Sequence, residues 1–93
     1  MIRRVSMWRL KNRSDAEEMR RALLSLKGDV SSLAGIEVGV NISPHESAYD
    51  IVFIGTFADK EALLEFESDE FHIAVGGLVS KLRDNRVVVE YEC

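Results

Sequence analysis

The sequence has little cysteine, little proline and no long apolar run: one cysteine and one proline occur in 93 residues. The lone thiol, Cys93, cannot form an internal disulfide, so the fold does not depend on an oxidising compartment. The basic start, residues 1–13, lacks the apolar core of a signal peptide because Arg9 and Lys11 interrupt it, and no segment is long enough to span a bilayer. We therefore expect a cytoplasmic protein with no membrane partner.

Positive charge is scarce as well, since 12 Lys and Arg stand against 16 Asp and Glu and the formal net charge is −4. Nucleic-acid binding relies on cationic surfaces, so we expect no nucleic-acid partner. Histidine occurs twice, as His45 and His72. His45 stands in a loop with no second histidine or cysteine beside it, and we expect neither a metal site nor another cofactor.

What the sequence does contain, 46% hydrophobic and 30% charged residues, is typical of a globular chain. Its length predicts a single domain over residues 1–93. A chain this short buries a small share of its surface, so its core is marginal unless another chain covers part of it.

The polarity pattern predicts the order strand, helix, strand, strand, helix, helix, strand. Alternating residues mark four strands, over 2–11, 36–42, 49–57 and 86–92. Apolar residues at helical spacing mark three helices, over 14–30, 60–68 and 70–84. Together they indicate an α+β, ferredoxin-like βαββααβ fold with a four-stranded antiparallel sheet.

Polar residues before the predicted helices explain where these helices begin. Ser14 and Glu17 form a capping-box pattern, in which each side chain bonds a free backbone N–H group of the first turn. Asp59 and Asp69 precede the other two helices and are suited to accept bonds from their first N–H groups.

Three of the four strands are apolar on both faces, although the helices can cover only one face of the sheet. A second copy packed sheet to sheet would cover the other face and make a twofold homodimer. The residues expected at this interface are Val5, Met7, Val52, Ile54 and Val88.

The chain resembles the stress-responsive dimeric α/β-barrel family, often called Dabb. The resemblance runs from end to end and rests on five segments: "MIRRVSMWRLK", "GIEVGVN", "YDIVFIGTF", "FESDEFHIAV" and "RVVVEYE". Members of that family are ferredoxin-like homodimers, and they include plant polyketide cyclases and proteins without an established activity. The resemblance implies a ligand pocket between sheet and helices.

In the cyclase-like members, two histidines line that pocket, one from the first strand and one from an HPxH-like tetrapeptide that begins the last helix. Here the tetrapeptide is Asp69-Glu70-Phe71-His72, so only its second histidine is present. The strand histidine falls on Arg4, and an aromatic residue with a hydroxyl group falls on Phe66. Arg4 stays protonated and cannot act as a base, while Phe66 offers no hydroxyl group.

Two roles are open for each polar candidate. His72 is a candidate general base, or a helix-end histidine without chemistry. Arg4 is a candidate anion clamp, or the partner of Glu90 or Glu92 on the last strand. The other residues expected to line the pocket are Trp8, Met19, Leu23, Ile36, Phe66, Val75 and Gly76.

Gly76 and Gly77 inside the last predicted helix cost roughly 1 kcal/mol each relative to alanine, which suggests the close approach of either the first helix or a ligand, with helix packing favoured. For function, the sequence favours a stress-response homodimer that binds a small aromatic or polyketide-like ligand. A cofactor-free cyclase, isomerase, lyase or monooxygenase with His72 as base is the first alternative. A structural protein whose own side chains fill the pocket is the second.

Overall fold

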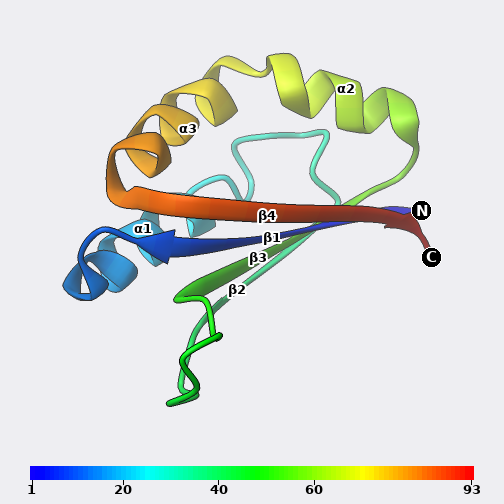
Figure 1. Cartoon of the computed structure of the whole chain (residues 1–93). Helices are drawn as coiled ribbons and strands as arrows, with labels where there is room; N and C mark the ends of the chain where they lie inside the picture. Colours follow the sequence, from blue (N-terminus) through cyan, green and yellow to red (C-terminus); the bar gives the residue numbers. More distant parts are fainter.

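The computed structural model describes all of residues 1–93, and its elements follow the predicted order (Figure 1). The strands are β1 (Ile2–Leu10), β2 (Gly35–Val40), β3 (Ile51–Phe57) and β4 (Arg83–Glu92). The helices are a 3-10 turn, η1 (Arg13–Asp15), and α1 (Ala16–Leu24), α2 (Lys60–Ser68) and α3 (Glu70–Leu82). All strand pairs are antiparallel and the sheet order is β2-β3-β1-β4, which confirms the ferredoxin-like α+β fold.

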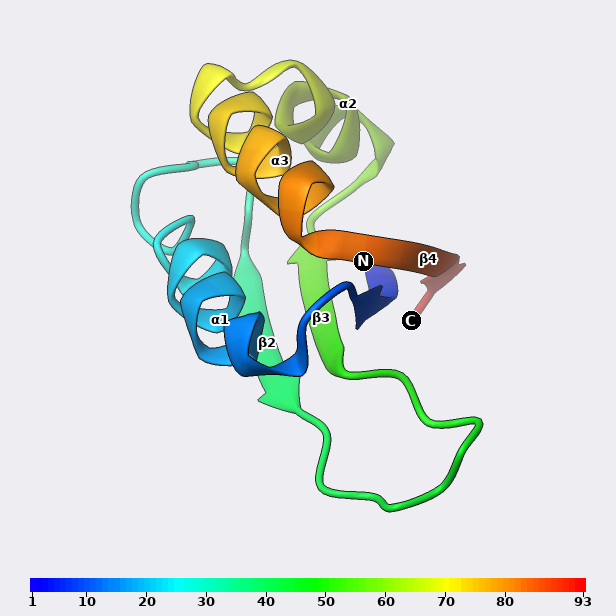
Figure 2. The same cartoon turned by 60° about the vertical axis from the view of Figure 1, so that its left-hand side comes forward.

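The helices cover one face of this sheet. Figure 1 shows α2 and α3 passing over the strands, and Figure 2 shows α1 next to α3 on the same side. The buried residues of β1 alternate as predicted, and they are Ile2, Arg4, Ser6, Trp8 and Leu10. On β3, Gly55 leaves room for a neighbouring ring, because a Cβ atom there would lie 2.8 Å from Phe53. None of the helices has the length and apolar character that crossing a membrane requires.

The predicted caps of α2 and α3 are confirmed. Asp59 accepts a bond from the backbone N–H of Ala62 at 2.9 Å. Asp69 accepts bonds from Phe71 N at 2.8 Å and His72 N at 3.2 Å, and its extended backbone separates α2 from α3. These bonds satisfy donors that a helix start otherwise leaves unpaired.

The predicted start and end of the first helix are wrong. Ser14 lies inside the η1 turn, so α1 begins only at Ala16, and no side chain caps it. The helix ends at Leu24, and turns follow over residues 25–29, with a positive φ of 84° at Gly28. Leu26 is still buried, because these turns keep it against the core.

The face opposite the helices is apolar, and we call it the open face. Its central residues are Val5, Met7, Val52, Ile54, Val87 and Val89. Val88 was predicted here, but it pairs with Ser6, whose side chain is buried on the helix side. Because directly paired residues project to the same face, Val88 belongs to the helix side. Because Val87, Val88 and Val89 are identical, the sequence does not show which of them faces the helices.

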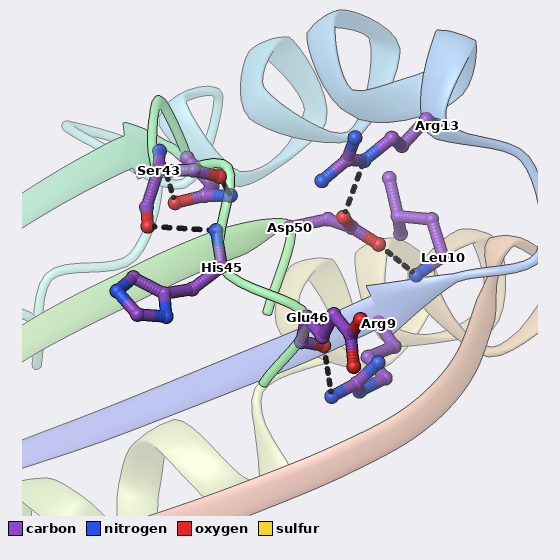
Figure 3. A network of polar contacts seen from close by, with 8 residues as sticks. Arg9, Leu10, Arg13, Ser43, His45, Glu46 and Asp50 are labelled. Atoms are coloured by element: carbon purple, nitrogen blue, oxygen red, sulfur yellow. Dashed lines mark hydrogen bonds and ion pairs between the residues drawn. The ribbon is translucent and has the colours of Figure 1, made fainter. Parts of the chain in front are cut away.

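The long loop between β2 and β3 is anchored at its end by Asp50. Its carboxylate accepts the N–H of Leu10 at 2.8 Å and the Nε–H of Arg13 at 3.0 Å (Figure 3). Nearer the loop tip, Arg9 donates to the carbonyl oxygen of Glu46 at 3.3 Å. Figure 2 shows the loop at the end of the molecule away from α2. The network therefore anchors the loop to the end of β1 and to η1, at the end of the molecule away from α2.

Candidate functional site

A cavity of about 280 Å³ lies between the sheet and the helices. Its apolar walls consist of Trp8, Leu23, Leu26, Phe53, Phe66, Val75 and Val79. The other lining residues are Arg4, Ser6, Glu67, His72, Gly76, Ser80, Arg83 and Arg86. An apolar pocket with a few converging polar groups is the usual form of a small-molecule site.

One stripe of α3 forms the roof of this cavity. Val75, Gly76, Val79 and Ser80 lie three, four, seven and eight residues after His72, which places all five on a single helical face. The bonds from Asp69 to the first turn of α3 fix where this face begins. The cap on α3 therefore sets the position of His72 over the sheet.

Two of the predicted pocket residues lie elsewhere. Met19 on α1 is fully buried in the core, and it does not reach the cavity. Ile36 packs against the core from β2, the edge strand farthest from β4. Since Arg83 and Arg86 of β4 line the cavity, it extends toward the β4 edge of the sheet, away from Ile36. The other predicted pocket residues, Trp8, Leu23, Phe66, Val75 and Gly76, do line it.

The expected close packing at Gly76 and Gly77 is wrong. A Cβ atom at either glycine would meet no atom within 4 Å. Gly76 instead lines the cavity, whereas Gly77 is exposed. The missing side chain at Gly76 thus leaves open volume above the sheet.

His72 is held in a defined orientation at one end of the cavity. Its ring stacks on Phe66, with the two centroids 3.9 Å apart and an interplanar angle of 25°. Its Nδ1 atom lies 2.9 Å from the carbonyl oxygen of Phe66. A carbonyl oxygen only accepts, so Nδ1 carries the proton and the neutral ring has its lone pair on Nε2. No protein group bonds Nε2.

Burial lowers the pKa of His72, because the imidazolium form loses water that the protein does not replace. The bond to Phe66 and the charge of Glu67 oppose this shift, while the charge of Arg4 adds to it. The pKa still falls below its usual value, so the imidazole is neutral at pH 7. A neutral, oriented imidazole can take a proton from a bound molecule.

Arg4 lies at the same end of the cavity but is already engaged. It pairs with Glu90 at 2.6 Å and also with Glu67, and it is only 8% exposed. Burial lowers the pKa of Arg4, but the bonds from the two carboxylates raise it more. The ion pair with β4 is therefore present, through Glu90 and not Glu92, which lies opposite Ile2. With two carboxylates bound, Arg4 does not fit the anion-clamp role.

Five polar residues of the cavity were not predicted from the sequence: Ser6, Glu67, Ser80, Arg83 and Arg86. A signal for Arg86 was present, because alternation along β4 places it on the same face as Glu90. Arg86 lies opposite Trp8 in the register, as Glu90 lies opposite Arg4. Nothing in the sequence predicted that Arg83 lines the cavity, because the last helix was expected to continue past it, to residue 84.

The cavity offers no metal-ligand set, since His, Cys, Asp and Glu side chains nowhere gather in groups of three. Its chemistry rests on one imidazole, three guanidinium groups and one lining carboxylate.

Comparison with known proteins agrees with this architecture. No curated protein sequence matches the chain. A dimeric protein of unknown function with a ferredoxin-like fold from Bacteroides fragilis is 20% identical, with a TM-score of 0.87 over 99% of this chain and 95% of that one. Hydroxynitrile lyase from Passiflora edulis is 13% identical, with a TM-score of 0.84 over 97% and 90% of the two chains. An antibiotic biosynthesis monooxygenase is 17% identical, with a TM-score of 0.77 over 100% and 98%.

At these identities the structural likeness establishes the fold, and it shows that the same fold occurs in a dimeric protein and in enzymes. The sequence model of one family, Dabb, described as a stress responsive A/B barrel domain, matches residues 2–93. This match covers nearly the whole chain and includes every strand and helix. The protein belongs to the Dabb family.

Proposed function

We propose that this protein is a stress-response homodimer in which each subunit binds a small aromatic or polyketide-like molecule in its sheet–helix cavity. The observation that carries this proposal is the open volume of about 280 Å³ with aromatic walls from Trp8, Phe53 and Phe66. A cavity of about 150 Å³ already holds benzene, so this one has room for a ring with a short substituent. A cytoplasmic location remains part of the proposal, consistent with the single thiol.

The open volume also argues against a purely structural protein whose pocket is filled by its own side chains. Phe66 is 1% exposed and stacks on His72, and Trp8 packs against Phe53 with ring centroids 6.5 Å apart. These aromatic residues are thus fully packed, and the space beside them is still free.

The homodimer is supported by the open face of the sheet. Its side chains include exposed Met7, Val87 and Val89, at 38%, 38% and 62% exposure, and no helix covers them. Contiguous apolar surface of this kind marks an interface, and a twofold dimer pairs the same surface with itself. Because the cavity lies on the opposite face, dimerisation would leave it accessible.

A cofactor-free enzyme is the second candidate, and the orientation of His72 favours it. With Nδ1 bonded to the carbonyl oxygen of Phe66, Nε2 is the atom free to accept a proton from an acidic C–H or O–H group. The resulting imidazolium would keep its Nδ1 bond, and nearby Glu67 would stabilise the charge. Cyclisation, isomerisation, lyase chemistry and cofactor-free oxygenation all can begin with such a proton transfer.

Trp8 provides the test for binding, because it is the single tryptophan and lines the cavity. We expect the neutral probe 3-phenylpropanamide to change Trp8 emission in a saturable manner. Gly76→Leu should abolish the change by filling the cavity. Gly77→Leu adds the same side chain on the exposed side and should bind as the wild type does. Equal binding by both variants, or no saturable change in the wild type, would contradict the proposal.

For the enzyme candidate, proton abstraction can be followed with phenylacetone in D₂O, by the rate of deuterium incorporation beside its carbonyl group. We expect the wild type to accelerate the exchange and His72→Gln to lose the acceleration. His45→Gln, a change in the exposed loop, is the control. Identical rates in wild type and His72→Gln would remove the enzyme candidate and leave the binding proposal in place.

A further inference from the structure

The cavity has different chemistry at its two ends. His72 lies in the first turn of α3 and Arg83 directly follows its last residue, roughly 16 Å away along the helix axis. On β4, Glu90 faces Arg4, while Arg86 lies roughly 13 Å further along the strand. One end therefore holds His72 with Arg4, and the other end holds Arg83 with Arg86.

The two arginines at the far end have no carboxylate partner. Arg4 binds two carboxylates, but neither Arg83 nor Arg86 forms an ion pair, although the chain has a net charge of −4. Burial lowers the pKa of Arg86, and the charges of Arg4 and Arg83 lower it further. Glu67 lines the cavity and Glu90 binds Arg4 from outside the lining, so the three lining arginines face two carboxylates and one positive charge has no counter-charge.

An ordinary structural role accounts for Arg83 but not for Arg86. Arg83 stands at the C-terminal end of α3, where the helix dipole favours a cation. Arg86 lies on the sheet opposite Trp8, and no helix end explains its position. Trp8 itself is 5% exposed and its buried Nε1–H has no acceptor. Unpaired buried donors are rare, and this one belongs to a residue that lines the same cavity as the two arginines and lies opposite Arg86.

We infer that the ligand of the cavity is a carboxylic acid with an apolar or aromatic body, whose carboxylate is bound by Arg83 and Arg86. This inference rests on the proposed binding function and names the class of ligand. One monoanion balances the one uncompensated charge, and guanidinium groups form strong charge-assisted bonds to carboxylates. The apolar body then lies along Leu26, Phe53 and Val79 toward His72.

The test compares 3-phenylpropanoate with its uncharged analogue 3-phenylpropanamide, by titration of Trp8 emission at low ionic strength. We expect the acid to bind about tenfold more tightly than the amide. Arg86→Gln, and separately Arg83→Gln, should remove this preference by weakening acid binding more than amide binding. Arg21→Gln makes the same change in net charge at an exposed position of α1 outside the cavity, and should keep the preference.

The outcomes separate the two proposals. If neither compound binds the wild type, the binding function itself fails. If both bind equally, or if Arg86→Gln and Arg21→Gln lower acid binding equally, the carboxylate site is overturned and the binding function stands. Tighter binding of phenyl phosphate than of the carboxylate would also overturn the assignment to a monoanion. The melting temperature of each variant shows that the comparison concerns folded protein.

Discussion

The imidazole of His72 lies flat against the ring of Phe66, 3.9 Å between centroids, and its Nδ1 bonds the carbonyl oxygen of the same residue at 2.9 Å. Phe66 lies in the last turn of α2 and His72 in the first turn of α3. The extended backbone of Asp69 between the two helices brings these residues together. One residue thereby sets both the plane of the imidazole and its tautomer. This relationship decides which nitrogen of His72 faces any bound molecule as a base.

Acidification should destabilise the protein through His72. Burial lowers its pKa in the folded state, whereas the unfolded chain titrates near the usual value of about 6.5. Between these two pKa values the unfolded chain binds more protons, so the free energy of unfolding rises with pH in that window. His72→Gln should flatten this dependence between pH 5 and pH 7.5, as measured by urea unfolding.

The control for the pH experiment is His45→Gln, because His45 is exposed in the β2–β3 loop. It should keep the pH dependence of the wild type. A His72→Gln curve parallel to that of the wild type would show that His72 titrates alike in both states.

Because both carboxylates bind the buried guanidinium of Arg4, the stability effects of removing Glu67 and Glu90 should not be additive. Glu67→Gln or Glu90→Gln alone leaves Arg4 one carboxylate, so each should cost no more than about 1 kcal/mol. The double variant leaves a buried cation without a partner and should cost about 2–3 kcal/mol, more than the sum. Urea unfolding of the four proteins gives the coupling energy. Glu65→Gln, at an exposed position on α2, is the control, and additive single effects would refute the interdependence.

Asp50 should stabilise the end of β1 at neutral pH and lose this effect in acid. Burial raises its pKa, but the bonds from Leu10 and Arg13 outweigh that effect and hold the pKa below its usual value of about 3.9. Its contribution is therefore present above about pH 3.9 and is lost as the pH falls through the folded-state pKa. Asp50→Ala should cost about 2 kcal/mol at pH 7, because the N–H of Leu10 loses its acceptor.

The difference in melting temperature between wild type and Asp50→Ala should accordingly shrink from pH 7 to pH 3. Asp29→Ala, in the exposed turn after α1, should show no such difference. A difference in melting temperature that stays constant with pH would mean that the charge of Asp50 does not contribute to stability.

Neighbouring valines on β4 give a direct test of the proposed dimer. Val89 pairs with Val5 on the open face, and Val88 pairs with Ser6 on the helix side. Val89→Glu should shift the protein to monomer in size-exclusion chromatography with light scattering, because it places a charge in the apolar contact. Val88→Glu is the matched control and should remain dimeric. The reverse pattern would mean that the contact uses the helix side.

Most of the fold could be predicted from polarity alone, because strand and helix periods differ and each element buries one side. The alternation in β1 identified the buried face from Ile2 to Leu10, and Asp59 and Asp69 marked the starts of α2 and α3 correctly. The predicted start of α1 was wrong, since Ser14 lies in the η1 turn and Glu17 in the first turn of α1. A 3-10 turn and the first turn of an α-helix both fit this sequence, and packing decides which of them forms.

The sequence by itself determined the strand and helix order, the two helix caps and the apolar character of both sheet faces, because these depend on residues near one another in the chain. Only the tertiary structure decided the strand register and the course of α3 over the sheet. That register placed Val88 opposite Ser6, brought Glu90 to Arg4, and set Arg86 beside the cavity. Contacts between residues so far apart in sequence depend on how the strands pair, and a one-residue shift would reverse each of them.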